Sequence, residues 1–450
     1  MSSEWQVVRI EDIAAKRPSA MATGPFGSSI GAKYFQNAGV PVIRGSNLSP
    51  DIQTKLDDSG LVFVSDEKAR EFDRCLVGKG DLVFTCWGTI NQVGLIDRDA
   101  AYESYIISNK QMKLTVDEQR VDPRFIYYVF SGPEKQAEII DNGIGSSVPG
   151  FNLGQLRKHE VLLPSLREQR TIADTLDLFT DRITLLRKTN ATLESIAQAL
   201  FKSWFVDFDP VRAKAEGRQP EGMDATTAAL FPDSFEESEL GFVPKGWSVI
   251  PIGEAVECVG GGTPDTKNES YWQPEEFSWS SPKDLSGLQS PVLLSTERKL
   301  SAQGLAKVSS GLLPCGTLLM SSRAPIGYLA IARTPLAVNQ GYIAMLPGGK
   351  LPPLYLLFWC REKMEVIKGR ANGSTFMEIS KKAFRPIPVL VPSAAVLEAF
   401  ADIADPLFEH LVKNERQAQI LTQLRDTLLP RMISGQLRLP EAETLLESAL

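Results

Sequence analysis

The chain contains one pattern twice, and this internal repeat limits what it can fold into. Residues 145–205 and 373–433 align without a gap at an offset of 228. Within them, the tripeptide at 145–147 (GSS) corresponds to 373–375 (GST), and Pro164-Ser165 corresponds to Pro392-Ser393. A period near 230 residues is far longer than the ~20–50 residues of a solenoid unit. The repeat therefore predicts two copies of one domain, each followed by a long helix.

The earlier part of each half corresponds as well, with a drifting offset. Residues 5–10 (WQVVRI) resemble residues 247–252 (WSVIPI), and residues 109–111 (NKQ) align with residues 339–341 (NQG). Short apolar runs bounded by turn residues predict strands at 40–43 and 81–84, and Pro123 is typical of the first turn of a helix. Each copy therefore mixes strands and short helices.

The segments after Pro164 and Pro392 have the pattern of long helices that pair. Apolar residues recur there at alternating spacings of four and three, which is the pattern of a coiled-coil contact stripe. Ser165 and Glu168 have the spacing of a capping box at the start of the first helix. Asn190, Asn414 and Arg425 are polar members of the stripe. Its predicted apolar contacts are Ile172, Leu176, Phe179, Ile183, Leu193, Leu200, Phe400, Leu407, Leu411, Leu421 and Leu428.

Together these patterns predict an α+β fold with an internal repeat, in which the two long helices pair as a coiled coil. The expected division is a first mixed domain (1–164), a first helix (165–206), a connector (207–244), a second mixed domain (245–392), a second helix (393–436) and a tail (437–450). The connector is rich in proline, glycine and acidic residues, so we expect it to be largely irregular, with one short helix near 225–230.

Composition narrows the class of protein. A hydrophobic share of 43% suits a chain with substantial cores. We find no apolar run of membrane-spanning length and no basic-then-apolar start, so we expect no membrane association and a cytoplasmic location. The five cysteines include no Cys-x-x-Cys pair, so neither a disulfide framework nor a zinc site is expected.

The net charge of −7 argues against a simple nucleic-acid binder, which usually has a basic surface. The charge is uneven, however, because residues 246–392 carry 15 basic and 11 acidic side chains. Either the chain does not bind DNA, or it binds DNA locally and relies on a basic partner.

Catalytic motifs are weak in this sequence. Residues 27–31 (GSSIG) match a nucleophile elbow, but turn-like residues precede them where the elbow needs a strand. Asp51 with the run 66–68 (DEK) loosely matches a nuclease metal site, yet these residues lie in polar, turn-rich stretches. A phosphate-binding P-loop motif is lacking. We therefore predict no catalytic residue and no metal ligand.

Polar side chains in the loops of both copies are the remaining candidates for chemistry. Arginine and lysine can contact guanine, and asparagine and glutamine can pair with adenine, in the major groove. The candidate DNA-contact residues are Arg44, Asn47, Asn91, Gln92, Asn109, Lys110 and Gln111 in the first copy, and Lys283, Arg323, Asn339, Gln340, Lys381 and Lys382 in the second.

Four segments carry a specific family resemblance. Residues 196–210 (IAQALFKSWFVDFDP), 164–170 (PSLREQR), 321–327 (SSRAPIG) and 337–341 (AVNQG) resemble the specificity (S) subunits of type I restriction–modification enzymes. The resemblance covers essentially the whole chain. One departure is that the second helix has Ala394-Ala395-Val396 after its Pro-Ser, where the first has Arg-Glu-Gln. In this family the helices dock the modification subunits, so the docking surfaces of the two helices are expected to differ.

The resemblance implies a pseudo-twofold arrangement in which the two long helices form an antiparallel coiled coil and dock the modification subunits. It also implies a non-catalytic subunit that recognises a bipartite sequence in double-stranded DNA. It implies two copies of a modification (methyltransferase) subunit and a restriction/translocase subunit as partners. S-adenosylmethionine would belong to the modification subunits, ATP and Mg²⁺ to the restriction subunit, and no cofactor to this chain. Two alternatives are an autonomous DNA methyltransferase or nuclease, and a coiled-coil scaffold that does not bind nucleic acid.

Overall fold

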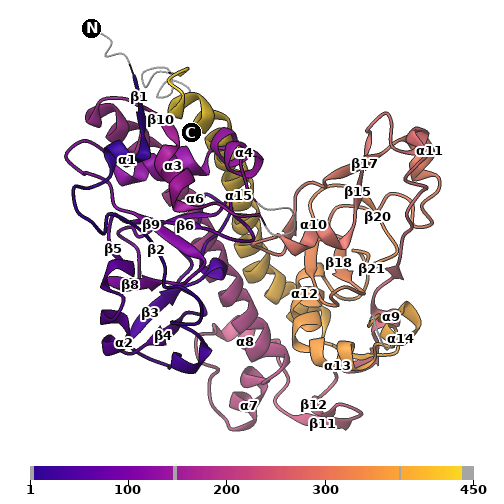
Figure 1. Cartoon of the computed structure of the whole chain (residues 1–450). Helices are drawn as coiled ribbons and strands as arrows, with labels where there is room; N and C mark the ends of the chain where they lie inside the picture. The colour runs from indigo at the N-terminus through magenta and orange to yellow at the C-terminus, as the bar shows by residue number, and fades with distance from the viewer. Residues whose placement is uncertain (1–4, 145–148, 374–376, 438–450) are drawn as a thin grey trace. The chain divides into compact units, whose positions relative to one another are not determined.

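The computed structural model describes residues 5–144, 149–373 and 377–437. These form two compact units, one made of Met1–Thr184 with Ile420–Leu450 and the other of Leu185–Gln419. Each unit holds one mixed domain and a part of both long helices, α6 (Leu166–Phe205) and α15 (Ala394–Ile433) (Figure 1). Within the described ranges, no helix combines the length and the apolar character needed to cross a bilayer.

The mixed domain of the first unit is built on two four-stranded sheets. One sheet has the antiparallel order β2-β9-β6-β7, and the other has the order β4-β3-β8-β5 with β3 and β8 parallel. A ribbon of β1 and β10 joins the first strand of the domain to the last. The strands are β1 (Gln6–Arg9), β2 (Met21–Thr23), β3 (Val40–Ile43), β4 (Val62–Val64), β5 (Leu76–Gly78), β6 (Leu82–Thr85), β7 (Val93–Leu95), β8 (Ser104–Ile107), β9 (Gln111–Leu114) and β10 (Glu160–Leu163). The helices are α1 (Ile10–Ile13), α2 (Asp66–Arg70), α3 (Pro123–Ser131), α4 (Pro133–Asp141) and α5 (Leu153–Lys158), with 3-10 turns η1 (Ala32–Tyr34), η2 (Gly45–Asn47) and η3 (Asp73–Cys75).

The second unit repeats this plan. Its sheets have the orders β14-β21-β18-β19-β16 and β17-β15-β20, with β15 and β20 parallel, and β13 pairs with β22. Its strands are β13 (Ser248–Pro251), β14 (Cys258–Val259), β15 (Phe277–Ser280), β16 (Val292–Leu293), β17 (Arg298–Leu300), β18 (Leu318–Ser321), β19 (Leu329–Ala332), β20 (Leu336–Val338), β21 (Tyr342–Met345) and β22 (Pro388–Val391). Its helices are α9 (Ile252–Ala255), α10 (Pro282–Ser286), α11 (Ala302–Leu305), α12 (Pro353–Glu362), α13 (Met364–Gly369) and α14 (Lys381–Phe384), with the 3-10 turn η4 (Glu269–Tyr271).

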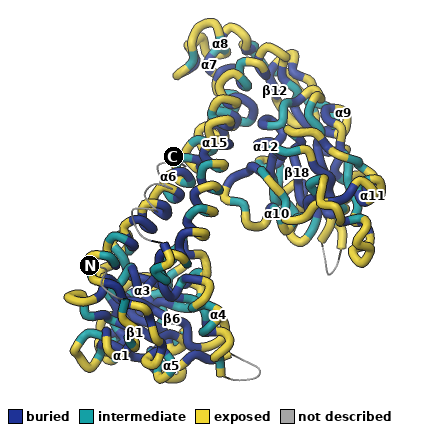
Figure 2. Tube along the Cα trace, turned by 90° about the horizontal axis from the view of Figure 1, so that it is seen from above, coloured by how far each residue is buried: buried dark blue, intermediate teal, exposed yellow. Residues whose placement is uncertain are grey.

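The register of the closing ribbons confirms the repeat. Gln6 pairs with Leu163 in the first domain, and Ser248 pairs with Val391 in the second. Leu163 and Val391 are separated by the offset of 228 that relates the two halves of the sequence. Buried residues run through the sheets of both domains (Figure 2). The predicted α+β class with two mixed domains and two long helices is therefore confirmed.

The connector is more ordered than its composition predicts. It contains the expected helix, α8 (Ala225–Ala229), and also α7 (Asp209–Ala215) and the hairpin of β11 (Phe235–Ser238) with β12 (Gly241–Pro244). Val211, Phe231 and Val243 are buried in one core with Trp204 and Trp247. The expectation of an irregular connector was wrong because a few apolar anchors, widely spaced in a polar segment, are enough to order it.

The apolar stripe predicted on the two helices is largely buried. Leu193, Leu200 and Leu407 are half-buried. Near its C-terminal end α6 also buries Phe201 and Trp204, which pack with the second mixed domain. The fully buried predicted contacts are Ile172, Leu176, Phe179, Ile183, Phe400, Leu411, Leu421 and Leu428.

Within the second unit the helices run antiparallel. Asn414 Nδ2 donates to Asn190 Oδ1 at 2.9 Å, and both side chains are buried. Fifteen residues further along α6, the ring of Phe205 lies 5.2 Å from that of Phe400, which precedes Asn414 on α15. A paired polar residue in an apolar stripe specifies register, because any slip would bury both amides without partners.

Within the first unit one glutamine of the mixed domain contacts both helices. Gln53 Nε2 donates to the backbone oxygen of Thr180 at 2.5 Å and to Thr184 Oγ1 at 2.7 Å. Gln53 Oε1 accepts from Arg425 Nη1 of α15 at 2.9 Å. The guanidinium of Arg425, 3% exposed, is thereby satisfied in the stripe together with Asp426.

The two long helices begin differently. In α6, the Glu168 carboxylate accepts from Ser165 N at 3.1 Å and Ser165 Oγ accepts from Glu168 N at 3.3 Å, which confirms the capping box. Gln169, fully buried, donates to the carbonyls of Pro164 and Arg120. In α15, Ser393 caps Val396, and Leu397 takes the place of Gln169. Glu168 and Gln169 therefore have a structural role at the start of the first helix.

A buried carboxylate ties the first mixed domain to α6. Asp177 Oδ1 accepts from Lys55 Nζ at 2.7 Å and from Tyr128 Oη at 2.6 Å, and its Oδ2 accepts from Arg124 Nη1 at 2.9 Å. Burial by itself raises the pKa of Asp177, but the charge of Lys55 and the hydrogen bonds from all three partners outweigh it, so the pKa is lowered. The ionised carboxylate therefore stabilises the folded unit.

Substitutions at the asparagine pair test the helix register. Asn190→Ala leaves the Asn414 amide buried without its acceptor, so we expect a loss of about 1–3 kcal/mol in unfolding free energy. Asn414→Ala should cost a similar amount, and the double variant should cost less than the sum of the two. Urea unfolding of the four proteins measures this coupling. Thr192→Ala, exposed on the same helix, is the control and should change stability by less than about 0.5 kcal/mol. Additive single effects would contradict the pairing.

Asp177 should make the stability of the first unit pH-dependent. Because its folded pKa lies below the unfolded value of about 3.9, its contribution is present above that pH and is lost as the pH falls through the lowered value. Asp177→Asn should cost roughly 3–5 kcal/mol at neutral pH, since Lys55 and Arg124 lose a buried counter-charge. Denaturant unfolding from pH 7 to pH 3 should also show a flatter pH dependence for the variant. Asp174→Asn, whose side chain is 63% exposed, should cost less than about 1 kcal/mol.

Candidate nucleic-acid interface

The candidate contact residues of the first domain gather around one hollow. This hollow, of about 650 Å³, lies between the loop after β3, the β6–β7 hairpin and the β8–β9 turn. Five of the seven predicted residues line it, whereas Asn47 and Asn91 do not. The predicted residues that line it are Arg44, Gln92, Asn109, Lys110 and Gln111.

Several of these polar side chains hold the loops in place. Asn47, 1% exposed, donates from Nδ2 to the carbonyls of Asp57 and Ser59 at 2.9 and 3.2 Å. Gln92 Nε2 donates to the carbonyl of Leu48 at 2.8 Å. Asn47 therefore uses both of its N–H donors within the protein and Gln92 uses one of its two, whereas bidentate pairing with adenine needs a free donor and a free acceptor on the amide. The structure therefore gives Asn47 and Gln92 a supporting role, and base contact by either stays an untested prediction.

Gln111 differs from the other amides. It is fully buried in the floor of the hollow, where its Oε1 accepts from Ser108 Oγ. Its Nε2 has no hydrogen-bond partner among the described residues, and the same holds for Arg44 Nε. Arg44 Nη2 donates to the carbonyl of Gly60 at 2.8 Å. The floor of the hollow is therefore rich in N–H donors, which suits an acceptor such as a guanine edge or a phosphate oxygen.

The rim of the hollow is exposed. Asn109 and Lys110 are exposed in the β8–β9 turn, and Asn109 Nδ2 donates to the carbonyl of Gly27 at 2.8 Å. Trp87, which our sequence analysis missed, also lines the hollow, and it is 48% exposed. Only arginine, lysine, asparagine and glutamine were considered as base-contact residues, whereas an exposed tryptophan at a hairpin tip is also typical of a binding surface.

The second domain places its candidates on equivalent loops. Lys283 is exposed on α10, where Glu297 Oε2 lies 2.7 Å away and raises the pKa of the ammonium group through a hydrogen bond and its charge. Arg323 lies at the tip of the β18–β19 hairpin, 3.8 Å from Glu378. Lys381 and Lys382 are exposed at the start of α14.

The β20–β21 turn of the second domain is shifted relative to our alignment. Asn339 Oδ1 accepts from Gly341 N at 2.8 Å, and exposed Gln340 accepts from Thr263 Oγ1 at 2.7 Å. Gln111 pairs with Thr85, and the corresponding strand position, opposite Ser321, is held by Tyr342. The alignment of Gln111 with Gly341 is therefore wrong by one residue.

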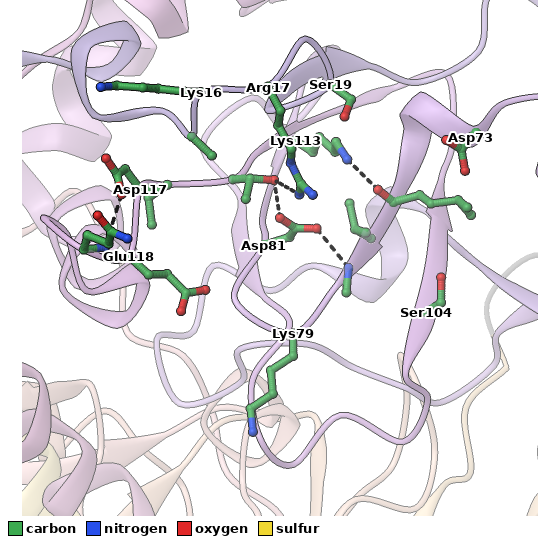
Figure 3. Close-up of a pocket in the computed structure, with 17 residues that line it drawn as sticks. Lys16, Arg17, Ser19, Asp73, Lys79, Asp81, Ser104, Lys113, Asp117 and Glu118 are labelled. Carbon is green, nitrogen blue, oxygen red and sulfur yellow. Dashed lines mark hydrogen bonds between the residues drawn. The ribbon is translucent and has the colours of Figure 1, made fainter.

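A second hollow of the first domain, about 840 Å³, has a different character (Figure 3). Two of its charged side chains are linked through a threonine, since Arg17 Nη2 donates to Thr115 Oγ1 at 3.1 Å and Thr115 in turn donates to Asp81. Lys113 Nζ donates to the carbonyl of Leu76 at 2.6 Å, and burial lowers its pKa. This hollow shares no lining residue with the first one, and its internal pairing indicates a structural role.

The described residues give no support to the catalytic alternatives. Around residues 27–31, β2 ends at Thr23 and turns follow, with Ser29 Oγ donating to the carbonyl of Phe26. The strand that a nucleophile elbow needs is therefore lacking there. Across the described ranges, no three histidine, cysteine, aspartate or glutamate side chains are grouped so that they could hold a metal ion.

A family model described as type I restriction modification DNA specificity domain matches residues 2–195 and 244–424. The chain belongs to this family. It is 26% identical over 406 residues to the type I restriction enzyme HindI specificity subunit of Haemophilus influenzae, covering 80% of this chain and 87% of that one. It is 34% identical over 193 residues to the MjaIX specificity subunit of Methanocaldococcus jannaschii, covering 42% and 44%.

A solved structure has the same fold. The S subunit of a type I restriction–modification system from M. genitalium superposes with a TM-score of 0.55 at 16% identity, covering 95% of this chain and 96% of that one. Two matches to the specificity domain, one in each half, make this chain a specificity subunit with two recognition domains rather than a catalytic subunit.

Two substitutions should separate supporting residues from contact residues. Asn47→Ala removes the donors for two carbonyls, so we expect a loss of about 1–3 kcal/mol in unfolding free energy. Lys110→Ala, exposed on the rim, should change stability by less than about 0.5 kcal/mol. Denaturant unfolding of both variants checks this difference. If Asn47→Ala is as stable as the wild type, Asn47 does not support the loop and is again a candidate for DNA contact.

Proposed function

We propose that residues 1–164 and 245–392 each recognise one half of a bipartite sequence in double-stranded DNA and so select the target of a type I restriction–modification complex. The observation that carries this proposal is that one scaffold occurs twice with different side chains on equivalent loops. Trp87, Asn109 and Lys110 belong to the first set of loops, and Arg323 and Gln340 to the second. Two copies with identical loops would select a repeated half-site, whereas these select two different ones.

The proposed partners follow from the family. Two modification subunits would bind S-adenosylmethionine and methylate adenine, and a restriction subunit would use ATP and Mg²⁺ to translocate and cleave DNA. The two long helices are the proposed docking elements for these partners. Their stripe residues are committed to helix pairing, so docking would use the opposite faces, where Leu178, Leu185 and Ile403 are exposed.

In this proposal, the side chains that contact bases are the candidates that are at least partly exposed to solvent. In the first domain these are Arg44, Asn109 and Lys110 around the hollow. Arg44 is half-buried and lines the hollow, and the other two are exposed on its rim. In the second domain the exposed or half-exposed candidates are Lys283, Arg323, Gln340, Lys381 and Lys382.

Electrostatics limits how the chain binds DNA. Non-specific affinity comes chiefly from phosphates neutralised by lysine and arginine, with release of counterions. A chain with a net charge of −7 supplies few such contacts, so the purified chain should bind DNA weakly and transfer no methyl groups. Specific binding would then need the basic surface of the modification subunits. Methyl transfer by the isolated chain would overturn this proposal.

Arg323→Ala tests the bipartite proposal. Loss of a bidentate contact to guanine should cost about 1–3 kcal/mol, so one position of the second half-site should become relaxed while the first half-site stays strict. The measurement is the set of methylated sites in cells that carry this chain with its modification subunits. Lys350→Ala, which removes an exposed charge of the same domain away from the loops, should leave the sites unchanged. A single continuous site, or relaxation in both halves, would contradict two recognition domains.

A further inference from the structure

One hairpin occupies the same place in both recognition domains. β6 and β18 are equivalent inner strands, each in third place in the sheets β2-β9-β6-β7 and β14-β21-β18-β19-β16. Each strand ends in a hydroxyl that donates to the carbonyl four residues further on, Thr85 to Thr89 and Ser321 to Pro325. Two residues after each hydroxyl comes the tip residue, which is Trp87 in the first domain and Arg323 in the second.

An isolated β-bridge at each hairpin tip is a second, independent observation that Trp87 and Arg323 occupy equivalent positions. Trp87 forms an antiparallel bridge with Gly150, and Arg323 forms one with Glu378. Gly150 and Glu378 are separated by 228, the offset that relates the two helices. Backbone hydrogen bonds from the next turn agree, since Cys86 N donates to Lys110 O at 2.7 Å and Ser322 N donates to Gly341 O at 2.8 Å.

Each tip residue has a bridge partner that suits its chemistry. A Cβ on Gly150 would lie 2.5 Å from a ring carbon of Trp87, so the indole packs on a position that tolerates only glycine. In the second domain the Glu378 carboxylate lies 3.8 Å from the Arg323 guanidinium. The chain thus carries two matched pairs at one position of the fold, tryptophan with glycine and arginine with glutamate.

Both tip residues remain accessible. Trp87 is 48% exposed although it is apolar, and the Arg323 side chain is 38% exposed. Burying the indole would have been favourable, so its exposure at a loop tip beside Asn109 and Lys110 points to a ligand that covers it. Arginine donates two parallel hydrogen bonds to N7 and O6 of guanine, whereas an apolar surface favours the methyl group of thymine.

We propose that position 87/323 is the place where the two recognition domains select different bases, with Trp87 selecting thymine through its methyl group and Arg323 selecting guanine. This inference rests on the proposed function, because it assigns a base preference to two residues of the same DNA-binding loops. The partner residues at 150 and 378 position the tip residues and need not touch DNA.

Exchange of the matched pairs tests the inference. The variant Trp87→Arg with Gly150→Glu, in the full chain with its modification subunits, should replace one A·T pair of the first half-site by G·C and leave the second half-site unchanged. The reciprocal variant, Arg323→Trp with Glu378→Gly, should do the opposite in the second half-site. Each preference should change by roughly 5- to 150-fold, as expected for one base contact. Sequencing of methylated sites gives the result, and Tyr102→Arg, an aromatic residue 40% exposed away from the hollow, is the control and should change nothing.

Variants that leave Gly150 unchanged keep the test independent of folding. Trp87→Phe retains an apolar surface and should keep the thymine preference, whereas Trp87→Ala should relax that one position. An unchanged first half-site in Trp87→Ala and in the exchange variant, with methylation still active, would overturn the inference. A slower reaction at an unchanged sequence would also overturn it, because it would make Trp87 a contact to the DNA backbone. Failure of the wild-type complex to methylate a bipartite site would instead overturn the proposed function.

Discussion

The pairing of the two long helices depends on polar side chains inside an apolar stripe. Leucine and isoleucine contacts at alternating spacings would tolerate a shift of one helix by a heptad, because one apolar pair replaces another at little cost. Asn190 and Asn414 do not tolerate it, since a shift would break the hydrogen bond between their buried amides. In the first unit, Arg425 imposes the same condition through Gln53, a residue of the recognition domain itself. The hydrogen bonds of Gln53 therefore contribute both to the register of the helices and to the attachment of that domain.

The two recognition domains show how one scaffold carries two different sets of loop side chains. The two domains share an antiparallel run of four strands (β2-β9-β6-β7 and β14-β21-β18-β19), a parallel pair in the other sheet (β3 with β8, β15 with β20) and the register of the closing ribbon, because buried side chains and backbone hydrogen bonds enforce these features. The outer strands differ, since β5 is added in the first domain and β16 in the second. The hairpin tips and the turns after the parallel strands face no such constraint, so tryptophan and arginine can occupy one position. Each such exchange needs only a local partner to change, as Gly150 and Glu378 illustrate.

Periodicity and spacing were sufficient to predict most of the fold. The alternating spacing identified the helix stripe, Ser165 and Glu168 identified the cap, and the strand at 40–43 matches β3. The connector was misjudged because three anchors, Val211, Phe231 and Val243, carry no local pattern. The site was harder still. An amide in a loop has the same appearance in sequence whether it faces DNA or donates to nearby backbone carbonyls, as Asn47 does. Trp87 and Arg323 are related by their β-bridges and by the hydrogen bonds of their hairpins, which only the structure shows.

Net charge did not predict DNA binding well, because the sequence does not show which charged side chains are paired inside the protein. Much of the acidity of the first unit is consumed internally, because Asp122, Asp174 and Asp177 all accept from Arg124, and Asp177 also accepts from Lys55. These carboxylates hold the domain to its helix and do not set the potential at its loops, where Lys110 and Arg44 remain. Salt screens the interaction of such distant charges within about 10 Å at 0.1 M. A subunit of net charge −7 can therefore present locally basic loops to DNA, while its low overall attraction to phosphate leaves discrimination to the base contacts themselves.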